Sequence, residues 1–190
     1  MDSQVLLHAC CGPCATVGTH ALREEGFRLT LYFYGGNIHP YEEWERRLCA
    51  LRLLAAEHDV QLAVRPYDTS EWDEAVKGLE SEREGGARCV ECMKLQLKSA
   101  ADEAKRLGIE NLCTSLTLSP QKKPENINLW GLEAARASDL NWINRIWRKR
   151  CGFAFSVSES KRLGLYRQNY CGCRYSLRDR LALQREKSIV

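Results

Sequence analysis

Six of the ten cysteines in this 190-residue chain form three close pairs, each within a short motif. The motifs are LLHACCGPC with Cys10 and Cys11, RCVEC with Cys89 and Cys92, and YCGC with Cys171 and Cys173. Thiolates bind zinc and iron–sulfur clusters, and paired thiols exchange electrons as dithiol and disulfide. The three motifs therefore predict a metal centre and a redox-active pair.

The first two motifs place four thiols where helices are expected to begin. Free amide groups and the helix macrodipole lower thiol pKa values there, and the thiolate is the form that binds metal. Cys89 and Cys92 are three residues apart, so both project from one face of a first helical turn. The side chains of the adjacent Cys10 and Cys11 can point toward one metal or cluster only if the backbone turns there. Four such thiolates suit either tetrahedral zinc or a 4Fe-4S cluster, and both remain open.

The remaining cysteines have simpler interpretations. Cys14 forms a CxxC with Cys11 and is an alternative ligand, or else a buried thiol on the first helix. Cys49, Cys113 and Cys151 lie outside the motifs, and we expect them to be small buried apolar residues.

The motif Cys171-Gly-Cys173 predicts different chemistry. A disulfide across one residue closes a small, strained ring, and strained disulfides tend to be labile and regulatory or catalytic. We interpret this pair as a redox switch, with two further metal ligands as the alternative.

Apolar periodicity predicts the elements that must position these thiols. Alternating or continuous apolar runs predict strands at 4–8, 27–34, 60–65, 111–117 and 140–146. Helical spacing predicts helices at 15–25, 41–58, 71–79, 89–107, 125–137 and 158–163, and a last one from Ser176. Alternation through residues 1–146 predicts a doubly wound α/β domain with a mostly parallel sheet flanked by helices. Residues 147–190 form a basic C-terminal segment of the same single domain.

The charge is unevenly distributed. Residues 1–120 carry 13 Lys and Arg against 19 Asp and Glu, and residues 121–190 carry 15 against 6. A basic third on an acidic body is typical of a polyanion-binding face, with a solvated surface as the alternative. The apolar runs are too short for a membrane span, and the N-terminus lacks a signal peptide, so we expect a cytoplasmic protein and no membrane partner.

Several long motifs resemble one family, the QueH-type epoxyqueuosine reductases, in order from residue 5 to residue 176. They are LLHACCGPC, YFYGGNIHPYEEW, YDTSEW, GLESEREGGARCVECMKLQL, SLTLSPQKK and GLYRQNYCGCRYS. The resemblance implies a fold like that of the adenine-nucleotide α-hydrolase (HUP) superfamily. It also implies reduction of epoxyqueuosine in tRNA to queuosine, dependent on a 4Fe-4S cluster, independent of cobalamin, and supplied by an external electron donor.

The resemblance also assigns roles to residues. It implies that Cys10, Cys11, Cys89 and Cys92 bind the 4Fe-4S cluster and that Cys171 and Cys173 are the redox-active pair. Asp68 of YDTSEW is a candidate ligand for an additional iron or zinc ion, or else a turn residue. Two segments, YGGNIHP and IWRKRCG, depart from the family pattern that we expect near the second metal and the substrate.

An anticodon-loop base is recognised through stacking on aromatic rings and contacts to phosphates. Trp147 is followed by three basic residues, a pattern that interleaves aromatic and cationic groups. The side chains that we expect to contact tRNA are Lys122, Lys123, Arg148, Lys149, Tyr166 and Arg167. Two alternative functions are a nucleotide-dependent tRNA-modifying enzyme and a zinc-binding RNA module. The first would need a phosphate-binding loop, which this sequence lacks.

Overall fold

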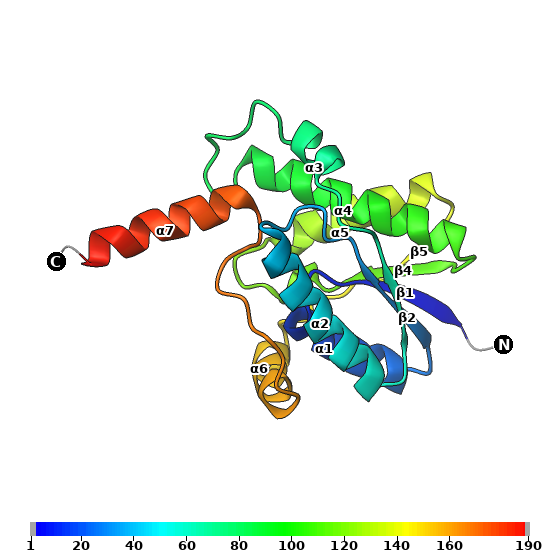
Figure 1. Cartoon of the computed structure of the whole chain (residues 1–190). Helices are drawn as coiled ribbons and strands as arrows, with labels where there is room; N and C mark the ends of the chain where they lie inside the picture. The colour runs from blue at the N-terminus through cyan, green and yellow to red at the C-terminus, as the bar shows by residue number, and fades with distance from the viewer. Residues whose placement is uncertain (1–2, 189–190) are drawn as a thin grey trace.

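The computed structural model describes residues 3–188, and Figure 1 shows a twisted parallel sheet between two layers of helices. The five strands run in the order β3-β2-β1-β4-β5, and every neighbouring pair is parallel. They are β1 (Gln4–His8), β2 (Arg28–Phe33), β3 (Gln61–Val64), β4 (Asn111–Thr114) and β5 (Asn141–Trp142). The predicted doubly wound α/β fold is confirmed.

Helices cover both faces of the sheet. On one face lie α1 (Gly12–Glu24) and α2 (Tyr41–Glu57), with α6 (Gly152–Arg162) packed on α1. On the other lie α4 (Ala87–Arg106) and α5 (Pro124–Ala137). The short α3 (Ser70–Ala75) packs on α4, η1 (Leu116–Leu118) follows β4, and α7 (Arg174–Ser188) projects from the body.

The central strand β1 explains the two-layered core. Val5 and Leu7 belong to the core beneath α1 and α2, whereas Leu6 belongs to the core beneath α4 and α5. All three side chains are fully buried, because a parallel sheet covered on both faces leaves no strand face in water. Helix α1 begins with Pro13 in its first turn and ends before Gly26, whose φ of +85° suits a residue without a side chain.

Two predicted strands are too long and one predicted helix is too short. The strand predicted at 111–117 ends at Thr114, because Leu116 donates its amide to the Thr114 hydroxyl and the chain turns into η1. The strand predicted at 140–146 pairs with β4 only at Asn141–Trp142. The helix predicted at 158–163 spans Gly152–Arg162.

The carboxyl ends of β1 and β4 mark the place where a site is expected. From β1 the chain crosses to β2 on one side, and from β4 it crosses to β5 on the other. Such a switch point opens a crevice where ligands bind in open α/β sheets. Cys10 lies two residues after the end of β1, and Ser115 directly follows β4. No helix in residues 3–188 is long and apolar enough to cross a membrane.

Candidate active site

Three sulfur atoms gather at the carboxyl end of β1. The sulfurs of Cys10, Cys11 and Cys14 lie within 4.8 Å of one another. Cys11 occupies the N-cap position of α1, and Cys14 lies in the first turn of that helix. Of the two interpretations of Cys14, the structure supports the one in which it joins the cysteine group. Within the described residues, no other group of His, Cys, Asp or Glu side chains brings three ligand atoms this close.

The three thiols differ in their pKa values, and only one of them is expected to be a thiolate. Hydrogen bonds from the Cys11 and Cys14 side chains, helped by the charge of Lys122, lower the pKa of Cys10 well below its usual range. Burial raises the pKa of Cys11 to about 12, and the bond to Cys10 raises that of Cys14. The group therefore holds a thiolate at Cys10, and this donor set fits a thiophilic metal.

Polar side chains from the end of β4 and from the loop before α7 contact this group. The Cys10 sulfur lies 4.0 Å from the Ser115 hydroxyl, and Gln168 donates its amide to the Cys11 sulfur over 2.9 Å. His8, the last residue of β1, is fully buried and its Nδ1 lies 2.9 Å from the Thr114 hydroxyl. His8 is therefore a buried, hydrogen-bonded histidine.

The second motif lies in the first turns of α4. The Cys89 sulfur accepts the Gly85 amide over 3.2 Å, and the buried Cys92 sulfur accepts the Gln96 amide over 3.2 Å. Burial raises the pKa of Cys92 to about 12. These two sulfurs lie outside the close group at β1, so their binding to the same centre stays a prediction.

Cys171 and Cys173 are free thiols in the loop that precedes α7. Cys173 is buried beside Trp72, Val76 and Cys92, and its sulfur lies 3.5 Å from the Ser176 hydroxyl. The two cysteine motifs distant in sequence, RCVEC and YCGC, therefore meet between α4 and α7.

Two hollows connect the cysteine motifs. The larger, of about 690 Å³, is lined by the cysteines of α4 and of the last motif: Cys89, Cys92, Cys171 and Cys173. The smaller, of about 460 Å³, is lined by Cys10, Cys14 and Cys171. Both are also lined by Lys122 and Asn37. A substrate in these hollows would contact every cysteine motif.

The side chains expected to bind tRNA have different environments. Lys122 faces the cysteines, whereas Lys123 and Lys149 are exposed. Arg148 donates to the carbonyls of Ser119 and Lys122 and thereby holds the loop between η1 and α5. Trp147 is buried, and its indole donates to the Thr114 carbonyl, so this ring is not free to stack on a base.

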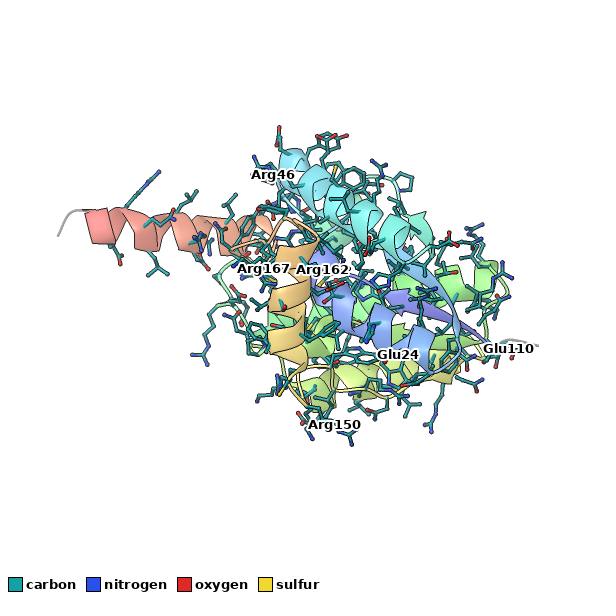
Figure 2. The ribbon with its side chains drawn as sticks, turned by 90° about the horizontal axis from the view of Figure 1, so that it is seen from below. Glu24, Arg46, Glu110, Arg150, Arg162 and Arg167 are labelled. Atoms are coloured by element: carbon teal, nitrogen blue, oxygen red, sulfur yellow. The ribbon has the colours of Figure 1, made fainter. Side chains whose placement is uncertain are left out.

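Tyr166 and Arg167 also have partners inside the protein. The Tyr166 hydroxyl donates to Glu43 over 2.7 Å, and Arg167 donates to the Ser160 hydroxyl over 3.1 Å. The Arg167 side chain is nevertheless exposed beside α6, as Figure 2 shows. Contacts of all six side chains with tRNA stay predictions.

Four further predicted residues can be placed. Asp68 is exposed and accepts the Ser70 amide over 2.9 Å, which matches its interpretation as a turn residue before α3. Its role as a metal ligand stays a prediction. Cys113 is buried as expected, but the prediction is wrong for Cys49 and Cys151, which are exposed. Cys49 faces solvent from α2, and Cys151 precedes α6 in a left-handed turn.

Sequence reasoning missed the polar partners of the cysteines. Gln168 lies within the recognised GLYRQNYCGC motif, but nothing in its spacing relates it to Cys11. Glu43 and Arg47 are four residues apart on α2, a spacing that usually indicates an exposed pair, and both are buried.

The fold and the site together define an α/β protein with a thiol-rich crevice at the switch point of its sheet, where three cysteines could hold a metal. Comparisons with known proteins identify its family. Residues 5–179 match the family model described as Epoxyqueuosine reductase QueH. The chain belongs to this family. It is therefore an oxidoreductase of queuosine biosynthesis, and that role implies a tRNA substrate.

Individual relatives agree. The chain is 37% identical over 177 residues to the Epoxyqueuosine reductase QueH of Acinetobacter baylyi, covering 93% of this chain and 81% of that protein. It is 34% identical over 179 residues to that of Thermotoga maritima, covering 93% and 91%.

A solved structure shows the same fold. A predicted subunit of tRNA methyltransferase from Methanocaldococcus jannaschii superposes with a TM-score of 0.58 at 14% identity, covering 83% of this chain and 74% of that one.

Proposed function

We propose that this chain reduces epoxyqueuosine in the tRNA anticodon loop to queuosine with a 4Fe-4S cluster and without cobalamin. The observation that carries this proposal is the meeting of the cysteine motifs around two hollows that share Cys171 and Lys122. Conversion of an epoxide to an alkene consumes two electrons and two protons and releases the oxygen as water. Because no ordinary side chain supplies those electrons, the thiol-lined site needs a redox cofactor.

The cluster ligands that we propose are Cys10, Cys11, Cys89 and Cys92. The close group of three sulfurs at β1 supports the first two and makes Cys14 a competitor for one position. When bound, the cluster would supply electrons one at a time. An additional iron or zinc ion with Asp68 as a ligand belongs to the same proposal.

We assign Cys171 and Cys173 the role of a dithiol–disulfide pair. Oxidation of the two thiols to a disulfide releases two electrons and two protons, which is the stoichiometry of one epoxide reduction. An external electron donor then restores the dithiol. The position of Cys171 on both hollows supports this role, because it faces the space that a substrate would occupy.

The ammonium group of Lys122 has a place in this proposal. It faces Cys171, Cys10 and Cys14, and attraction to the thiolate forms of these residues raises the pKa of Lys122, so the side chain stays protonated. A cation in the crevice would stabilise the negative oxygen that develops as the epoxide opens. The exposed Lys123 and Lys149 and the arginines near α6 would hold the tRNA backbone, and a tRNA substrate implies a reaction in the cytoplasm.

The test is anaerobic purification followed by iron, sulfide and zinc analysis and a visible absorption spectrum. About four irons and four sulfides per chain are expected for the cluster, and extra iron or zinc would support the second site. A colourless protein with one zinc and no sulfide would overturn the proposed cofactor and leave the zinc-bound RNA module as the better description.

A further inference from the structure

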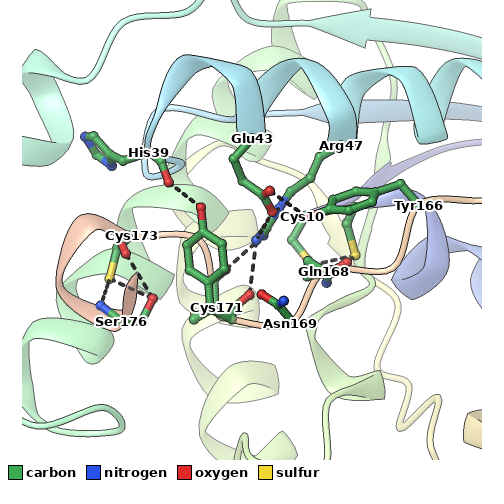
Figure 3. Close-up of polar contacts among 12 residues, drawn as sticks. Cys10, His39, Glu43, Arg47, Tyr166, Gln168, Asn169, Cys171, Cys173 and Ser176 are labelled. Carbon is green, nitrogen blue, oxygen red and sulfur yellow. Dashed lines mark hydrogen bonds and ion pairs between the residues drawn. The ribbon is translucent and has the colours of Figure 1, made fainter. Parts of the chain in front are cut away.

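The loop that carries the last cysteine motif is attached to α2 by a buried arginine. We call residues 166–173, which lie between α6 and α7, the strap. Figure 3 shows the strap passing beneath α2, with Arg47 and Glu43 reaching down to it. Nothing in the chemistry assigned above uses Arg47, which is only 2% exposed.

The guanidinium of Arg47 binds the strap through backbone atoms. Its Nη1 donates to the Cys171 carbonyl over 2.9 Å, and its Nη2 donates to the Tyr170 carbonyl over 3.1 Å. On its other side, Nε donates to a Glu43 oxygen over 2.8 Å. One planar group thus fixes two successive peptide units, which a flexible lysine ammonium cannot reproduce.

Glu43 completes the attachment. It is 4% exposed, and its second oxygen accepts the Tyr166 hydroxyl over 2.7 Å, so the same ion pair holds both ends of the strap. Removing two charges from water is costly, and apolar residues of similar volume often stabilise a fold as well. A buried pair whose free donors all go to one loop therefore indicates a role in fixing that loop.

The glycine between the two cysteines is shaped to this arginine. Gly172 has a φ of +127°, and a Cβ built on it would lie 2.8 Å from Arg47 Nη1. Its carbonyl accepts the His39 amide over 2.8 Å. A side chain at this position would both strain the backbone and displace the guanidinium.

Arg47 also faces the first cysteine motif. Burial opposes the charge of Arg47, but attraction to the thiolate forms of Cys11 and Cys10 and to Glu43 outweighs that effect and raises its pKa. The same cation therefore lies between the strap and the sulfur group at β1.

We propose that Arg47 is a positioning residue that holds Cys171 and Cys173 in their dithiol geometry beside the crevice. This inference rests on the proposed redox role of the pair. Its bonds to two carbonyls of the strap favour the backbone conformation in which both thiols are free. When these two carbonyls are released, the loop closes more easily into the Cys171–Cys173 disulfide, and two electrons and two protons pass to the oxidant.

The experiment measures the equilibrium between dithiol and disulfide directly. Metal-loaded protein is equilibrated anaerobically in buffers of graded glutathione to glutathione disulfide ratio, quenched in acid and alkylated. The Cys171–Cys173 peptide is then quantified by mass. The variants are Arg47→Met and Arg47→Lys, and the control is Arg52→Met, which changes an exposed arginine of the same helix.

We expect Arg47→Met to shift the equilibrium toward the disulfide on the order of tenfold, the loss expected for hydrogen bonds from a charged group. Arg47→Lys should shift it in the same direction, and Arg52→Met should match the parent chain. An unchanged equilibrium in Arg47→Met, or a shift toward the dithiol, would overturn the inference.

A second measurement separates this inference from the redox role itself. If the parent chain forms no Cys171–Cys173 disulfide in any buffer, the proposed redox role fails. The rate at which iodoacetamide alkylates Cys171 then tests whether Arg47 positions the strap. Arg47→Met should change this rate, and Arg52→Met should not. An equal rate in both variants would refute positioning.

Gly172→Ala covers the case in which Arg47→Met does not fold. It should shift the same equilibrium toward the disulfide by displacing the guanidinium. The control is Gly26→Ala, which has a comparable positive φ of +85° but no atom within 4 Å of the added Cβ. An equal disulfide fraction in these two variants would contradict the role of Arg47.

Discussion

Gln168 donates its side-chain amide to the sulfur of Cys11 across 2.9 Å, although 157 residues separate the two in the chain. The strap that carries the last cysteine motif therefore touches the first one. Hydrogen bonds to a metal-bound sulfur tune its basicity and orient it. The contact places Gln168 beside the cysteine group, where it would support a bound metal without being a ligand.

Gln168→Met removes this hydrogen bond while nearly preserving the side-chain volume. We expect metal affinity to fall by about 10- to 100-fold, the usual cost of losing a partner of a metal ligand. Competition with a chelator, followed optically under anaerobic conditions, measures the change. Asn169→Ala, which alters the exposed neighbouring side chain, is the control. Equal affinities in the two variants would show that the Gln168 contact does not support the metal.

The redox pair predicts a selective loss of turnover. Cys171→Ser and Cys173→Ser should each abolish multiple-turnover reduction of epoxyqueuosine tRNA, because neither variant retains a pair that can be oxidised to a disulfide and reduced again. Metal content should stay at the parent level. Product nucleoside is measured by digestion and mass spectrometry, with Cys49→Ser as an exposed control. Normal turnover of Cys173→Ser with intact metal would reject the electron-relay role.

The alternation of strands and helices was predictable because each element carries its own apolar period. Val5, Leu6 and Leu7 form a continuous apolar run, which indicates a strand buried on both faces, and the structure confirms it. The ends of β4 and β5 were not predictable from this signal. A hydroxyl at Thr114 redirects the chain, and such a local hydrogen bond leaves no trace in hydropathy.

The candidate site was partly predictable for a similar reason. Cysteine spacing identifies thiols that lie near one another in sequence, as for Cys10, Cys11 and Cys14. It does not predict contacts between distant segments, such as Arg47 with the Cys171 carbonyl, which depend on how the strap crosses α2. The basic stretch around Trp147 shows a second limit of sequence reasoning. Its composition predicts an exposed surface, but the indole of Trp147 is buried.

The two neighbouring lysines of the SPQKK motif should behave differently. Lys123→Met should weaken tRNA binding and reduce the slope of log affinity against log salt by about one, as expected for the loss of one phosphate contact. Lys122→Met should leave that slope unchanged, because the ammonium faces the cysteines. Binding titrations at several salt concentrations measure both slopes. A reduced slope in Lys122→Met would place its ammonium on the tRNA backbone.

Lys122→Met should also reduce the reactivity of Cys171. The charge of Lys122 lowers the pKa of Cys171, but burial and the nearby Cys173 outweigh it, and the pKa is raised overall. Without the lysine the pKa rises further, so less thiolate is present near pH 8. Alkylation of Cys171 by iodoacetamide should therefore be severalfold slower than in the Lys123→Met control. An equal rate would mean that Lys122 does not act on this thiol.

Acid should destabilise the metal-free protein through His8. Burial lowers the pKa of His8 to about 4 from about 6.5, although the charge of Cys10 partly opposes this. Between these values the unfolded chain binds a proton that the folded chain does not, so acid favours unfolding. The contribution is complete above about pH 6.5 and is lost progressively down to pH 4, a change of about 3 kcal/mol.

Denaturant unfolding from pH 7.5 to pH 4.5 measures this contribution. His8→Gln should be less stable than the parent chain at pH 7.5, because it disturbs a fully buried site, but its stability should vary less with pH. His20→Gln is the control, since His20 is largely exposed beside Glu24 on α1. His20→Gln changes an exposed side chain and should retain the parental slope. A parental slope in His8→Gln as well would assign the acid sensitivity to other groups.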